Sequence, residues 1–119
     1  MEKENVILKK SFDFALQIIE FSEILEDSKK YVIARQVLKS GTSIGANVRE
    51  AQGAESKLDF IHKMKIALKE AEETEYWLLL CKHSVNYHFN ESLLDSVKEL
   101  LKLLTCIIQT TQYNHKNSN

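Results

Sequence analysis

The sequence predicts an all-α protein that folds as an antiparallel, up-down-up-down four-helix bundle. Apolar residues recur every three or four positions in four segments of similar length, which is the period of an amphipathic helix. Short polar connections separate these segments, and short connections favour antiparallel packing of neighbouring helices. The chain has no proline and only 3 glycines, fewer turn-forming residues than a β-sandwich or barrel needs.

The first helix is expected near residues 4–27, and it is apolar over more than half of its circumference. Its first stripe consists of apolar residues at helical spacing, namely Ile7, Phe14, Ile18, Phe21 and Leu25. A second stripe lies beside the first and consists of Leu8, Phe12, Ala15 and Ile19. Asp27 and Ser28 are expected to break the helix and to supply the N-cap of the next one.

The second helix is expected near residues 29–53. Its apolar period continues in phase through Ser40-Gly41-Thr42-Ser43, which predicts one continuous helix. The alternative is a turn at this stretch between two shorter helices. Within a helix, Gly41 should reduce stability by about 1 kcal/mol relative to alanine.

The third helix is expected near residues 57–84 with Ser56 as its N-cap, and the fourth near 91–112 with Asn90 or Ser92 as its N-cap. The residues between them form a loop or a frayed helix end. Residues 1–113 are expected to form a single domain, and residues 114–119 a disordered polar tail that has nothing to bury.

Composition and charge limit the class of protein. A chain of 119 residues fits one domain. Its 16 basic and 17 acidic residues give a net charge of −1, so any contact with nucleic acid must use a local basic patch. The chain shows no signal-peptide core and no membrane-spanning run, and Cys81 and Cys106 lack ligand spacing. These features predict a cytoplasmic protein with reduced thiols and no membrane contact.

The third helix carries more apolar surface than an isolated bundle needs, since one apolar stripe suffices to face a core. Its outward residues are Ile66, Glu73, Trp77 and Leu80, with Tyr76 at their edge. The second helix has small residues on its outward face, which would let another helix approach closely, namely Thr42, Ser43, Ala46 and Gly53. These eight residues predict the interface of a homo-oligomer. The alternative is that Trp77 and Ile66 pack on a loop or on the chain end.

Basic residues concentrate in and before the second helix, namely Lys29, Lys30, Arg35, Lys39 and Arg49. In a ring of subunits such a cluster repeats and would form a phosphate-binding band, so these residues are the candidate contacts to nucleic acid. The alternatives are a solvated face or salt bridges between subunits.

No catalytic or metal-binding constellation emerges. Asp59 and His62 form a D-x-x-H pair, but a di-iron bundle needs a second such pair, which is missing. The glutamates at positions 70–75 resemble the first half of the Mg²⁺ site of all-α nucleotide pyrophosphohydrolases, yet Glu91 and Asp95 are spaced one residue too far apart for its second half. We therefore expect no enzyme activity, no cofactor and no small-molecule substrate, with a Mg²⁺-dependent nucleotide hydrolase as a remote alternative. Glu75 points toward the core stripe, and Arg35 and Arg49 are candidate partners for it.

Two sequence blocks carry a family resemblance. The first block comprises Ser43, Ile44, Asn47, Val48 and Glu50, and the second comprises Ala67, Glu70, Glu73 and Glu75. Residues 38–80 thereby resemble the bacterial four-helix-bundle family named for proteins encoded in intervening sequences of 23S rRNA genes, whose members are described as ribosomal-protein-like. The resemblance implies a homopentameric ring and carries no catalytic residues. A basic pentameric accessory protein of diversity-generating retroelements is similar in fold and binds nucleic acid, but this chain departs from it in charge.

The sequence indicates one function and one competing function. The first is a non-enzymatic, oligomeric helical bundle that binds RNA or acts as an adaptor for another protein. The competitor is a structural ring that contacts only proteins, which the near-zero net charge favours.

Overall fold

The computed structural model describes residues 5–117, which form four helices and, within that range, no strand. The helices are α1 (Val6–Asp27), α2 (Tyr31–Ala51), α3 (Lys57–His83) and α4 (Glu91–Lys116). The all-α class and the four predicted helices are confirmed. Positions 1–4 and 118–119, which the predicted first helix, domain and tail include, lie outside the described residues.

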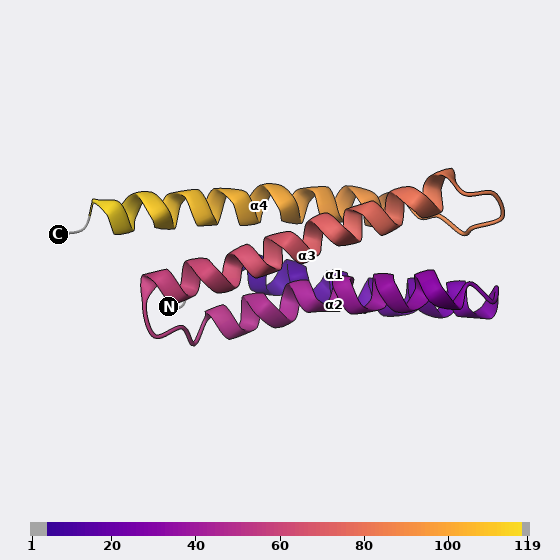
Figure 1. Ribbon diagram of the computed structural model, residues 1–119, viewed down its shortest axis with the longest axis horizontal. Coiled ribbons are helices and arrows are strands. Elements are labelled where there is room, and N and C mark those ends of the chain that lie inside the picture. The colour runs from indigo at the N-terminus through magenta and orange to yellow at the C-terminus, as the bar shows by residue number, and fades with distance from the viewer. Residues whose placement is uncertain (1–4, 118–119) are drawn as a thin grey trace.

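The helices form an elongated body with principal extents of 55 × 27 × 20 Å. Each helix packs on the next in the chain, α1 also makes a smaller contact with α4, and the Cα atoms of α1 and α3 stay more than 8 Å apart. The α1–α2 and α3–α4 connections lie at one end of the molecule and the α2–α3 connection lies at the other (Figure 1). The first turn of α1 and the last turn of α4 point toward the latter end.

All four helices contribute fully buried side chains to one core. The largest of these include Ile18, Leu25, Ile44, Met64, Leu78, Leu94 and Leu104. Burial of each such side chain stabilises the fold by about 1.5–3 kcal/mol relative to exposure. None of the helices in the described part of the chain is long and apolar enough to cross a membrane.

Two glycines of α2 lie where this helix packs closely on α1. A Cβ atom added at Gly41 would lie 2.8 Å from Ile18 Cγ2, and one at Gly45 would lie 3.2 Å from the backbone oxygen of Ser11. Both positions therefore let α1 and α2 approach closely. The prediction of one helix through Gly41 is confirmed, and the glycine is needed for interhelical packing and does not form a turn.

Three helices begin at side-chain caps. The side chains of Asn5, Ser56 and Asn90 accept hydrogen bonds from the backbone N–H groups of Leu8, Asp59 and Ser92, respectively. These bonds satisfy donors that the first helical turn leaves without partners.

The start of α2 differs from the prediction. Ser28 terminates α1 and does not cap α2, whose N-cap position is occupied by Lys30 without a side-chain hydrogen bond. Lys29 adopts a φ of 64°, the left-handed conformation that often ends a helix. One residue in this conformation reverses the chain, so no Ser or Asp cap is required there.

The C-terminal part of α4 also differs from the prediction. The helix continues through Lys116, whereas a disordered tail was expected from residue 114. His115 and Lys116 lie in the last turn, where positive charge complements the helix dipole, and the Asn117 side chain donates a hydrogen bond to the Tyr113 carbonyl. Helix propagation therefore extends the chain past its last buried residues without any need for a core contact.

Candidate interaction surfaces of the bundle

The predicted basic residues separate into two groups. Arg35 and Lys39 are exposed one turn apart on the outer surface of α2. Lys29 is exposed just before the helix, and the Lys30 ammonium lies 4.9 Å from the centre of the Tyr87 ring in a cation–π contact. These four residues lie toward the same end of α2.

Arg49 lies apart from this group, about 21 Å from Arg35 along the helix axis. Within residues 5–117, neither arginine forms an ion pair, and Glu75 pairs with neither of them. The five predicted residues thus do not form one patch on a single chain, and both arginines are available for contact with another molecule.

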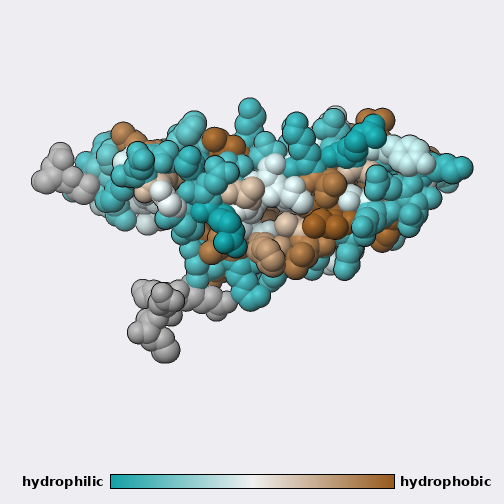
Figure 2. All heavy atoms as spheres, turned by 90° about the horizontal axis from the view of Figure 1, so that it is seen from below, coloured by the Kyte–Doolittle hydropathy of each residue, from teal (hydrophilic) through white to brown (hydrophobic). Residues whose placement is uncertain are grey.

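Arg49 belongs to an apolar surface that we call the α1–α2 face. A groove of about 120 Å³ runs between the two helices, lined by Leu8, Phe12, Ala15, Thr42, Gly45, Ala46 and Arg49. On the α1 side of this surface, Phe12 of the groove is 52% exposed, and Leu16 and Ile19 are 50% and 40% exposed. Figure 2, which views the molecule from the side on which α1 and α2 lie, shows hydrophobic side chains gathered there.

Only part of the α1–α2 face was predicted. Thr42 and Ala46 were expected at an interface, and both line the groove. The exposed residues Phe12, Leu16 and Ile19 were not assigned a role, although the second apolar stripe of the first helix contained two of them. That stripe was the signal that α1 has more apolar surface than its own core uses.

A second surface, the α3 face, is centred on Tyr76, whose side chain is 56% exposed. Glu72 and Glu73 precede it by one turn, and both are exposed without an ion-pair partner among residues 5–117. Trp77 is half-buried against the core, and its Nε1 atom is buried without a hydrogen-bond acceptor. Ile66 and Leu80 are also half-buried, so Tyr76 presents more surface to a partner than the tryptophan does.

The two family blocks lie on α2 and α3, which are joined by a hydrogen bond between two residues outside the blocks. The buried hydroxyls of Ser40 and Thr74 share a hydrogen bond of 2.8 Å across this contact. Ser43 donates to the Lys39 carbonyl and Asn47 donates to the Ser43 carbonyl, while Ile44 is fully buried. Ser43 and Asn47 therefore bond to the backbone of α2 itself, whereas Glu50 and Gly53 are exposed.

Glu70 is the one carboxyl group in this contact whose titration is clearly shifted. Burial raises the pKa of Glu70 above its ordinary value, and the neighbouring Glu73 carboxylate raises it further, while Lys39 and Lys69 partly offset both effects. The half-buried side chain thus binds its proton more tightly than an exposed glutamate does.

The candidate metal ligands do not assemble. Within residues 5–117, no group of three or more His, Cys, Asp or Glu side chains could hold a metal ion. Asp59 lies 3.7 Å from Lys63, and Glu91 lies 3.5 Å from Lys82. Cys106 is exposed, whereas burial raises the pKa of the Cys81 thiol to about 11.

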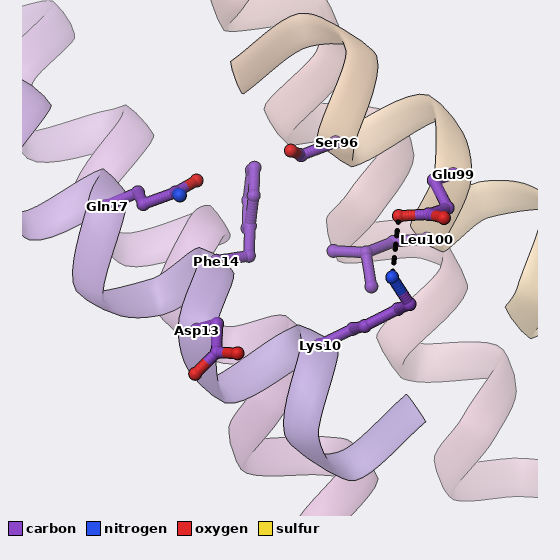
Figure 3. A pocket seen from close by; sticks show the side chains of 7 residues that line it. All are labelled: Lys10, Asp13, Phe14, Gln17, Ser96, Glu99 and Leu100. Carbon is purple, nitrogen blue, oxygen red and sulfur yellow. Dashed lines mark hydrogen bonds and ion pairs between the residues drawn. The ribbon is translucent and has the colours of Figure 1, made fainter. Parts of the chain in front are cut away.

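A small polar pocket of about 140 Å³ lies between α1 and α4 (Figure 3). Lys10 Nζ and Glu99 Oε1 are 3.2 Å apart across it, while Phe14 and Leu100 form its apolar side. The ion pair is exposed, and such pairs contribute little to stability or binding. The pocket shows no convergent set of polar groups that would select a ligand.

The fold places the chain among small four-helix proteins. A family comparison identifies it further: residues 3–109 match the 23S rRNA-intervening sequence proteins, and the chain belongs to this family. It is similar to the crystal structure of a protein of unknown function from the S23 ribosomal protein family from Bacteroides thetaiotaomicron, with 47% identity and a TM-score of 0.79 over 86% of this chain and 97% of that chain. No curated protein matches the sequence.

Proposed function

We propose that this protein is a non-enzymatic, cytoplasmic RNA-binding subunit that assembles as a homo-oligomeric ring of antiparallel, up-down-up-down bundles. Family resemblance favours five subunits. The observation that carries the RNA proposal is the exposed basic group Lys29, Arg35 and Lys39 at one end of α2, in which Arg35 has no ion-pair partner among residues 5–117. The family description, which names 23S rRNA intervening sequences, supports the choice of RNA.

Assembly would compensate for the low net charge of the chain. With a net charge of −1, one subunit has little general attraction for a polyanion. A ring repeats the basic end of α2 once per subunit and so places several cationic groups along one RNA backbone. Linked contacts of this kind bind more tightly than any single contact.

The test is a titration of labelled structured RNA, including 23S rRNA fragments, at low and physiological salt. We expect binding that weakens with salt, because phosphate contacts release counterions. Replacing Lys29, Lys30, Arg35 and Lys39 with alanine should weaken binding and reduce the slope of log affinity against log salt by up to about four per subunit in contact.

A variant with an equal loss of charge controls for the general effect of net charge. Lys57, Lys65, Lys98 and Lys102 are exposed lysines outside the basic end of α2, and their replacement with alanine should leave more affinity than the first variant retains. Equal losses in both variants would refute the site, and absence of binding by the wild type at low salt would refute RNA binding.

A ring that contacts only other proteins is the second candidate, and the net charge of −1 favours it. It predicts no RNA binding at low salt and a protein partner that co-purifies from cell extract after nuclease treatment. Loss of every co-purifying protein on nuclease treatment would count against it.

A further inference from the structure

We propose that neighbouring copies of the chain associate head to tail, with the α3 face of one copy docking on the α1–α2 face of the next. This inference rests on the ring of the proposed function and specifies its contact surfaces. Both surfaces expose large apolar or aromatic side chains, Phe12 and Leu16 on one and Tyr76 on the other. Large exposed apolar patches mark interaction sites in soluble proteins.

The groove of the α1–α2 face matches an aromatic side chain in size. Its volume is about 120 Å³, and Gly45 and Ala46 contribute little side-chain bulk to it. A cavity of about 150 Å³ holds a whole benzene ring, so an open groove of about 120 Å³ accommodates part of the Tyr76 ring from a second copy. Tyrosine is among the residues most enriched at the energetic centres of interfaces.

Charge complementarity identifies a second copy as the occupant. Arg49 lines the groove and has no ion-pair partner within residues 5–117. Glu72 and Glu73 lie four and three positions before Tyr76, respectively, which places them beside it on the surface of α3. A copy that inserts Tyr76 into the groove therefore brings two unpaired carboxylates toward an unpaired guanidinium, which steers association and fixes its register.

The two surfaces have no residue in common, because one is formed by α1 and α2 and the other by α3. A contact between two different surfaces is heterologous, and a heterologous contact closes into a ring when its rotation permits. A pairing of one face with itself would instead yield a two-fold dimer and leave the other face uncovered.

Two variants test the contact by light scattering and sedimentation velocity. Phe12→Asp places a carboxylate in the groove, and Tyr76→Asp removes the aromatic ring that enters it. Each should weaken assembly by at least about 30-fold, the loss expected for a central aromatic anchor. Val32→Asp, at a position that is 64% exposed and outside both faces, should assemble like the wild type.

Mixing the two defective variants provides the sharper test. The Phe12→Asp copy keeps its α3 face and the Tyr76→Asp copy keeps its α1–α2 face, so an equal mixture retains a single kind of intact contact. We expect heterodimers and no rings. Circular dichroism verifies that each variant is folded, and Leu16→Asp replaces Phe12→Asp if the latter loses helix.

The outcomes separate this inference from the proposed function. Three results would each overturn the head-to-tail contact: rings of wild-type size in both variants, dimers formed by Tyr76→Asp alone, or a mixture without heterodimers. Each of them would leave a ring built through other surfaces. A monomeric wild type would overturn both proposals. Heterodimers together with absent RNA binding would support the contact and overturn the RNA proposal.

Discussion

At the scale of single residues, Gly41 determines how closely α1 and α2 pack. The side chain of Ile18 is fully buried and leaves 2.8 Å for a new Cβ atom. Overpacking of this kind costs about 1–3 kcal/mol, against the helix preference of alanine over glycine of about 1 kcal/mol. We expect Gly41→Ala to lower the free energy of unfolding by up to about 2 kcal/mol, measured by urea denaturation.

Gly53→Ala is the matched control for Gly41. Its new Cβ atom would meet nothing closer than 3.8 Å, and its φ is negative. Such a substitution stabilises a protein by about 0.4–1 kcal/mol, chiefly by restricting the unfolded chain. Equal stability of the two variants would show that the α1–α2 contact is looser than described.

The raised pKa of Glu70 predicts a pH dependence of stability. The folded state binds the Glu70 proton more tightly than the unfolded state does, so protonation of Glu70 stabilises the fold. This stabilisation is fully present below the ordinary pKa of 4.5 and is lost as the pH rises through the higher pKa of the folded state. We expect Glu70→Gln to be more stable than the wild type at neutral pH, and this difference to shrink as the pH falls toward 4.5. Thermal unfolding across this pH range measures it, and a constant difference would contradict it.

Adjacent residues show where sequence interpretation reaches its limit. Trp77 was the obvious aromatic residue of the outward stripe, yet it is half-buried and packs against the core, while Tyr76 beside it is exposed. A helix turns about 100° per residue, so small differences in the direction of packing decide which of two neighbours faces outward. A charged residue in place of Trp77 would therefore disturb folding as well as assembly. Tyr76 is the better position for a test of assembly.

At the scale of elements, the hydrogen bond between Ser40 and Thr74 joins α2 to α3 inside the core. Thr74→Val should lower the free energy of unfolding by about 1–3 kcal/mol, because the Ser40 hydroxyl loses its partner while it remains buried. Adding Ser40→Ala should recover part of that loss, since both polar groups are then removed. A double-mutant cycle by urea denaturation measures the coupling, and additive effects would contradict it.

Helix positions were predictable because local signals agreed. Ser56 and Asn90 cap helices where predicted, and the apolar periods of all four helices coincide with buried residues. The start of α2 was not predictable, because it depends on the left-handed conformation of Lys29 and on no capping side chain. The exposed stripe of α1 was visible as excess apolar surface, but the sequence alone does not indicate which stripe the core uses.

At the scale of the whole molecule, the packing predicts a gradient of local stability along α4. Leu104 is fully buried and Ile108 nearly so, whereas the residues beyond Thr111 are exposed. The last turns thus add no buried side chain to the core. Hydrogen exchange should proceed at least about 100-fold faster at residues 113–116 than at residues 97–104, because opening there exposes no core. Equal protection would show that another surface covers this end of the helix.

The division of the basic residues is a property of the whole fold. In the sequence, Arg35 and Arg49 belong to one basic helix. The apolar groove beside Arg49 forms only when α1 packs against α2. The candidate site was therefore predictable as a set of residue types. Its separation into a basic end and an arginine-lined groove required the packing of two helices.

The placement of the first turn of α1 and the last turn of α4 toward the same end of the molecule has a practical consequence (Figure 1). A peptide joined ahead of one and a protein joined behind the other would emerge together. The opposite end of the molecule, with the connections at residues 28–30 and 84–90, would stay clear. The bundle is thus suited as a one-sided display scaffold whose cargo does not obstruct the basic end of α2.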